Sequence, residues 1–140
     1  MAIRGVDDLV VYRLAREFKL ATYELVRTSA SAQQDFNYRA QLQDAASSVE
    51  SNIAEGYHRG SAAEAVLFLR YALGSLAEAR TRLIDGADCG HWPLAACSRA
   101  LDWADRCRRA TEAYRRTQAR FARERGAKAG RPPPGKERRG

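Results

Sequence analysis

The chain has 140 residues, a length that suits one domain able to bury a core without disulfides or metals. Hydrophobic residues make up 45% and charged residues 29%, as in globular proteins, and no run approaches the roughly 18 consecutive apolar residues of a membrane span. Three cysteines and an N-terminus without an apolar signal segment favour reduced thiols in a cytoplasmic protein over a disulfide framework.

The net charge of +7 is concentrated in the C-terminal part of the chain. Residues 1–98 contain 10 basic and 12 acidic side chains, whereas residues 99–140 contain 14 basic and 5 acidic ones. A local cluster of this kind attracts polyanions more strongly than the same charge spread evenly.

Apolar residues at helical spacing predict a first helix over about residues 6–27, with Asp7 and Asp8 in its first turn. The small and polar residues 28–32 are expected to form a loop. A second helix is predicted over about residues 37–55, with Asp35 or Asn37 as its N-cap. Gly56 is expected to end it as the C′ residue, because glycine accepts the left-handed conformation.

A capping box of Ser61 and Glu64 predicts the start of a third helix, which continues to about Asp88 and is closed by Gly90. The fourth predicted helix covers about residues 93–125, with Pro93 at an early position that tolerates proline. Residues 126–140, which contain three consecutive prolines and five basic residues, are predicted to be a disordered tail.

Four amphipathic helices with short joints predict an all-α fold, an antiparallel up-down-up-down four-helix bundle over residues 1–125. The sequence lacks the metal-ligand and phosphate-loop motifs of common enzymes, so we expect no catalytic residue, metal or cofactor. Cys89 and His91 with Cys97 match no common zinc spacing, and Cys97 and Cys107 lie on an apolar stripe. We expect these two thiols to be core residues.

Polar side chains flank the predicted joint between the second and third helices. They are Gln41, Ser48, Asn52, Glu55, Arg59, Ser75 and Glu78. Buried polar groups are costly unless they are hydrogen-bonded, so we predict that these residues form a network that sets the register of the two helices. A binding or catalytic pocket is the alternative interpretation.

The same region resembles a known family. Residues 52–56 (Asn-Ile-Ala-Glu-Gly), then Arg59 and Ser61, then residues 73–78 (Leu-Gly-Ser-Leu-Ala-Glu), are similar to the four-helix-bundle proteins encoded in bacterial large-subunit ribosomal RNA intervening sequences. The resemblance spans about residues 6–101. It implies an antiparallel bundle that assembles into a ring-like homopentamer. It also implies relatives that act, without enzymatic activity, as accessory proteins to the reverse transcriptases of diversity-generating retroelements and bind RNA through basic surfaces.

The leading functional hypothesis is therefore binding of RNA or DNA phosphates, or of a ribonucleoprotein, by the basic fourth helix and tail. The helix arginines are Arg106, Arg108, Arg109, Arg115, Arg116, Arg120, Arg123 and Arg125. The tail adds Lys128, Arg131, Lys136, Arg138 and Arg139. The alternatives are an oligomeric scaffold that docks a protein such as a reverse transcriptase through Trp92, Trp103 or Tyr71, and an enzyme built on Asn52, Glu55 and Glu78.

Overall fold

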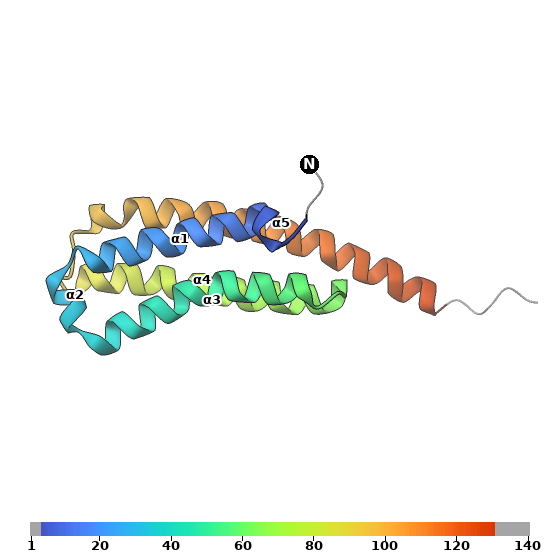
Figure 1. Cartoon of the computed structure of the whole chain (residues 1–140), viewed down its shortest axis with the longest axis horizontal. Helices are drawn as coiled ribbons and strands as arrows, with labels where there is room; N and C mark the ends of the chain where they lie inside the picture. The colour runs from blue at the N-terminus through green and yellow to red at the C-terminus, as the bar shows by residue number, and fades with distance from the viewer. Residues whose placement is uncertain (1–3, 131–140) are drawn as a thin grey trace, which may run out of the picture.

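The computed structural model describes residues 4–130, and within them it contains helices and no strand, which confirms the all-α prediction. The helices are η1 (Val6–Asp8), α1 (Val10–Arg27), α2 (Ala30–Gln34), α3 (Phe36–His58), α4 (Ala62–Asp88), η2 (Leu94–Cys97) and α5 (Ser98–Ala129). The long helices lie side by side, and the short α2 joins α1 to α3 at one end (Figure 1).

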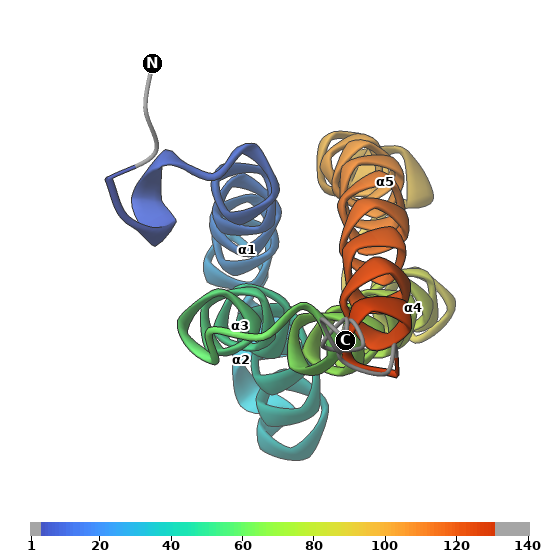
Figure 2. The same cartoon turned by 90° about the vertical axis from the view of Figure 1, so that its right-hand side faces the viewer.

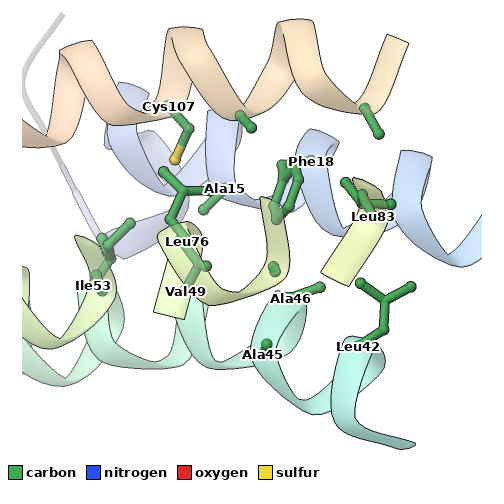
Figure 3. Close-up of a cluster of buried hydrophobic side chains, with 14 of the residues drawn as sticks. Ala15, Phe18, Leu42, Ala45, Ala46, Val49, Ile53, Leu76, Leu83 and Cys107 are labelled. Carbon is green, nitrogen blue, oxygen red and sulfur yellow. The ribbon is translucent and has the colours of Figure 1, made fainter. Parts of the chain in front are cut away.

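The four long helices α1, α3, α4 and α5 surround one apolar core. Each packs against two of the others: α3 against α1 and α4, and α5 against α1 and α4. Viewed end-on, they occupy the four corners of the molecule (Figure 2). Phe18, Leu76, Leu83 and Cys107 point from three different helices into the same space (Figure 3). Burial of these side chains is the main favourable term in forming the fold.

Three predicted helix boundaries are confirmed by their capping contacts. Asp35 Oδ1 accepts a hydrogen bond from the backbone N–H of Tyr38 at 3.3 Å and begins α3. Ser61 Oγ accepts from the N–H of Glu64 at 3.1 Å and begins α4. Gly90, with φ of 82°, follows the end of α4. In the two side-chain caps the donor and the acceptor are three residues apart, so both are local contacts, and of the two candidates for the first cap Asp35 is the one observed.

The expected ends of the first helix need correction. Leu9 adopts an extended conformation and buries its side chain, so Asp7 and Asp8 belong to the separate turn η1 and α1 begins at Val10. The predicted loop over residues 28–32 contains the start of α2. Ser29 Oγ accepts a hydrogen bond from the N–H of Ala32 at 3.2 Å and caps that short helix.

Gly56 does not end a helix, contrary to our prediction. It is buried within α3, and a Cβ placed there would lie 3.1 Å from Phe68 Cβ. Its lack of a side chain lets α4 approach α3 closely, and Gly60, with φ of 75°, lies in the connection between the two helices.

The fourth long helix also differs from its predicted bounds. Pro93, with an extended ψ of 146°, is the N-cap of the short helix η2. Because η2 comes first, α5 begins only at Ser98. It continues to Ala129, so residues 126–129, which were expected in the tail, are helical. Gly130 is the C-cap of this helix, and residues 131–140 of the predicted tail lie outside the described residues.

Candidate nucleic-acid interface

The last part of α5 projects beyond the connection between α3 and α4 (Figure 1). The core-facing residues of this helix, Ala100, Ala104, Cys107 and Thr111, are all buried and recur at spacings of three and four. After Thr111 no residue of α5 is buried, and residues 123–130 are all exposed. We refer to residues 115–129 as the α5 arm.

Three of the eight arginines predicted to bind nucleic acid are engaged locally, before the arm begins. Arg108 donates to Asp105 Oδ1 at 2.8 Å and to Glu112 Oε2 at 3.2 Å, and Arg109 Nη2 lies 3.1 Å from Asp105 Oδ2. The hydrogen bond from Arg108 lowers the pKa of Asp105, so this carboxylate stays charged and offsets the guanidinium charge. Arg106 lies over the ring of Trp103, 4.3 Å from its centroid.

The other five arginines predicted to bind nucleic acid all lie in the arm. They are Arg115, Arg116, Arg120, Arg123 and Arg125. None of them has a carboxylate oxygen within 4.0 Å among residues 4–130. Lys128, which we expected in the tail, belongs to the same helix. Residues 113–130 contain six basic side chains and one acidic one, Glu124, so the arm is strongly positive.

The predicted polar network between α3 and α4 is not assembled. Gln41 Nε2 donates to Asn37 Oδ1 at 3.2 Å, and Asn52 Nδ2 donates to the carbonyl of Ser48 at 2.8 Å, both within α3. Glu55 accepts from Arg59 Nε at 3.0 Å, one turn further along.

The α4 members of the predicted network, Ser75 and Glu78, make no side-chain hydrogen bond to another described residue. Glu55 and Glu78 are exposed, so water solvates them and they need no partner across the helices.

The thiols behave as core groups, as expected for Cys97 and Cys107. Cys97 Sγ lies 3.5 Å from the carbonyl oxygen of Leu83, and Cys107 Sγ lies 3.8 Å from Thr111 Oγ1. Burial raises the pKa of both thiols, that of Cys107 to about 11, so both remain neutral near pH 7. Within residues 4–130, no three His, Cys, Asp or Glu side chains gather in a way that suits a metal ion.

Sequence reasoning missed a cluster around His91 at the end of the molecule that carries α2. His91 Nδ1 lies 2.9 Å from Ser31 Oγ, and Nε2 lies 3.2 Å from Asp35 Oδ2. Ser29 Oγ donates to the carbonyl of His91 at 2.8 Å. These contacts, which we call the His91 brace, tie the α1–α3 joint to the α4–α5 connection. Its members are about 60 residues apart in the chain, so no local pattern reveals them.

Two aromatic side chains extend the His91 brace into the core. Trp92 Nε1 donates to the carbonyl of Leu83 at 3.0 Å, and Tyr38 Oη donates to the carbonyl of Arg82 at 2.5 Å. Burial raises the pKa of Tyr38 far above its usual value, so its hydroxyl remains a donor. The hydroxyl of Tyr38 and the ring of Trp92 lie against Gly86, where a Cβ would overlap them. A glycine inside a long helix was the one local signal of this close approach.

No helix formed by the described residues combines the length and the apolar character needed to cross a bilayer. No curated protein matches the chain. The family model of the 23S rRNA-intervening sequence protein matches residues 7–113, which comprise most of the four long helices and end just before the α5 arm. The chain therefore belongs to the 23S rRNA-intervening sequence protein family.

Proposed function

We propose that this protein is a non-enzymatic accessory protein that binds RNA, or a ribonucleoprotein, through the α5 arm and the basic C-terminal tail. One observation carries the proposal: the arm presents five arginines and a lysine that have no carboxylate partner among the described residues. Guanidinium groups bind phosphate oxygens through two parallel hydrogen bonds, and free ones do so without first breaking an internal ion pair.

Binding of this kind depends on charge more than on base sequence. Each phosphate neutralised by the arm releases condensed counterions, so affinity falls steeply as salt rises. Phosphate contacts position a protein on nucleic acid but do not read its bases, so we expect weak sequence preference.

The test measures binding of a labelled RNA hairpin by fluorescence anisotropy over a series of salt concentrations. The triple substitution Arg116→Gln, Arg120→Gln and Arg123→Gln should weaken binding at least about tenfold and reduce the slope of log K against log salt by about 2–3. The matched control is Arg16→Gln, Arg70→Gln and Arg99→Gln, which removes three exposed arginines outside the arm. Equal affinity of the two triple variants, or binding that is insensitive to salt, would contradict the proposal.

We also propose that the four long helices form an antiparallel up-down-up-down bundle and that five bundles assemble into a ring-like homopentamer. The family resemblance is the main support. Large apolar side chains that are exposed in the single chain, among them Leu20, Leu67 and Leu94, give further support, because assembly would bury them. Five arms on one ring would bind a long polyanion more tightly than one arm can.

The alternative function is a scaffold that docks a protein such as the reverse transcriptase of a diversity-generating retroelement. A groove of about 540 Å³ between α4 and α5 favours this second candidate, because it combines apolar side chains such as Leu73 and Leu76 with the charged side chains of Arg80, Asp105, Arg108 and Glu112. Of the anchors suggested by the sequence, Trp92 is buried and Trp103 is half-buried, whereas Tyr71 is 51% exposed. A reverse transcriptase that co-purifies after nuclease treatment, and is lost in Tyr71→Ser, would favour the scaffold.

The His91 brace contains a serine, a histidine and an aspartate, but we interpret it as structural. In hydrolase triads Nε2 of the histidine meets the serine and Nδ1 meets the aspartate, whereas His91 has the reverse arrangement. We therefore retain the proposal of a protein without catalytic activity or cofactor. The three free cysteines support a cytoplasmic location.

A further inference from the structure

One stripe of α5 faces the connection between α3 and α4 and continues into the α5 arm. It consists of residues spaced by four, three, four and three: Tyr114, Gln118, Phe121, Arg125 and Lys128. At about 100° per residue these positions fall within a sector of roughly 80°, so they share one side of the helix. The first four line a pocket together with residues of the α3–α4 connection, and Lys128 lies exposed one turn further along the arm.

Phe121 is the residue of this stripe that packing within the bundle explains least. It is the only large apolar side chain in residues 115–129, and it is 43% exposed. It nevertheless lines the pocket instead of belonging to the core. Proteins that bind single-stranded nucleic acid combine such a ring, on which a base stacks, with cations that hold the backbone.

The size of the pocket favours a small ring. Its volume is about 150 Å³, and it lies between α5 and the α3–α4 connection. An apolar cavity of about 150 Å³ holds a benzene molecule, so a pocket of this size admits the single ring of a pyrimidine. The second ring of a purine would extend beyond it.

The polar groups around the pocket suit a base and its phosphates. Tyr57, Tyr114 and Gln118 belong to the lining, and no side-chain hydrogen bond between residues 4–130 engages them. Burial raises the pKa of Tyr114, and the nearby Tyr57 adds to this effect, so the Tyr114 hydroxyl keeps its proton and can donate to a base carbonyl. No acidic side chain is present among the lining residues, so nothing there repels a phosphate from Arg125 or Lys128.

Resting on the proposed function, we infer that this pocket binds one unpaired pyrimidine of a single-stranded RNA, with Phe121 stacked on the base and Arg125 and Lys128 on the neighbouring phosphates. Bases in a regular duplex are stacked on each other and paired, whereas single strands can present a base to an aromatic ring. The pocket therefore adds a modest preference for unpaired pyrimidines to binding that depends mainly on charge.

The first experiment compares single-stranded oligomers with the same number of phosphates: oligouridine, oligoadenosine and an abasic oligomer without bases. Anisotropy with the full-length protein should give an affinity about tenfold higher for oligouridine than for the abasic oligomer, with oligoadenosine weaker than oligouridine. Equal affinity for oligouridine and the abasic oligomer would overturn the inference and leave the proposed function intact. Failure to bind any of the oligomers would overturn both.

The second experiment compares Phe121→Leu, which removes the ring but keeps an apolar side chain, with Phe121→Tyr, the matched control that keeps a ring. Phe121→Leu should lower the affinity for oligouridine about tenfold and leave that for the abasic oligomer unchanged, whereas Phe121→Tyr should bind both as the wild-type protein does. Circular dichroism checks that the arm remains helical. Equal losses for the two oligomers in Phe121→Leu would show that Phe121 only positions the arm, and would overturn the base pocket.

Discussion

At the scale of single residues, Gly86 decides how one end of the core is closed. The hydroxyl of Tyr38 and the ring of Trp92 lie against its backbone, and Tyr38 Oη and Trp92 Nε1 each donate a hydrogen bond to a carbonyl of α4. Any side chain at this position would displace Tyr38 and Trp92, which are also held by their hydrogen bonds to the carbonyl oxygens of Arg82 and Leu83. A residue that local helix propensity disfavours is therefore required by tertiary packing.

We predict that Gly86→Ala lowers the free energy of unfolding by about 1–3 kcal/mol, because the added methyl group overpacks a rigid site. Gly74→Ala is the matched control, since Gly74 lies in the same helix and a methyl group added there would meet open space. The control should raise stability by about 0.5–1 kcal/mol through helix propensity alone. Urea unfolding measures both effects. A stabilised Gly86→Ala protein would show that the two rings can move away without cost.

The arginines illustrate how far sequence can predict a site. Their concentration in the last helix is evident from composition, and the pairing of Arg108 and Arg109 with Asp105 follows from spacings of three and four residues. Whether the remaining arginines are free depends on where the core ends. The end of the core is set by α3 and α4: α3 ends at His58 and α4 begins at Ala62, next to the arm.

At the scale of whole helices, α1 and α3 are joined by an ion pair between Lys19 and Glu50. The two side chains are only 15% and 13% exposed, and Glu50 Oε2 is buried without a hydrogen-bond partner. Charged groups this far from water are stable only when paired. The pair therefore constrains the position of α1 relative to α3, while apolar burial in the core supplies most of the free energy that holds the two helices together.

We predict that Lys19→Met lowers the free energy of unfolding by about 2–3 kcal/mol, because it leaves the Glu50 carboxylate buried and unpaired. Adding Glu50→Leu should restore most of the loss, since the double variant replaces the pair by apolar contact. The control is Glu24→Gln, which removes the exposed pair with Arg27 and should change stability by less than about 1 kcal/mol. Denaturant unfolding of the four proteins tests this. A Lys19→Met protein as stable as the Glu24→Gln control would refute the assigned role of the pair.

The connections between helices were less predictable than the helices themselves. The caps at Asp35 and Ser61 involve contacts over three residues. Ser61 was predicted correctly, and Asp35 was one of the two candidates that the sequence offered for its helix. The continuation of α3 through Gly56 depends on contact with Phe68 of another helix, so the isolated pattern of glycine after a helix was misleading. α2 is held in place by His91, which belongs to a distant connection.

At the scale of the whole molecule, we predict a particle of five chains. Light scattering of nuclease-treated protein should give five times the 15.6 kDa mass of one chain, because the family resemblance implies a ring of five and such a ring would bury exposed apolar side chains. The measurement is repeated in high salt, which weakens charge-mediated association with nucleic acid but not apolar contact. A mass equal to one chain under both conditions would contradict the ring, and the predicted RNA binding by the arm would still be testable.

The amino-acid sequence by itself determined the helical class, the cap at Ser61 and the concentration of arginine near the C-terminal end, and it narrowed the cap of α3 to Asp35 or Asn37. These features depend on periodicity, on contacts within one turn and on composition, all of which are local. Only the tertiary structure decided that Gly56 and Gly86 serve close packing, that His91 braces α2, and that the last arginines extend past the core. Each of these outcomes depends on which distant residues meet when four helices pack together, and a linear pattern does not contain that information.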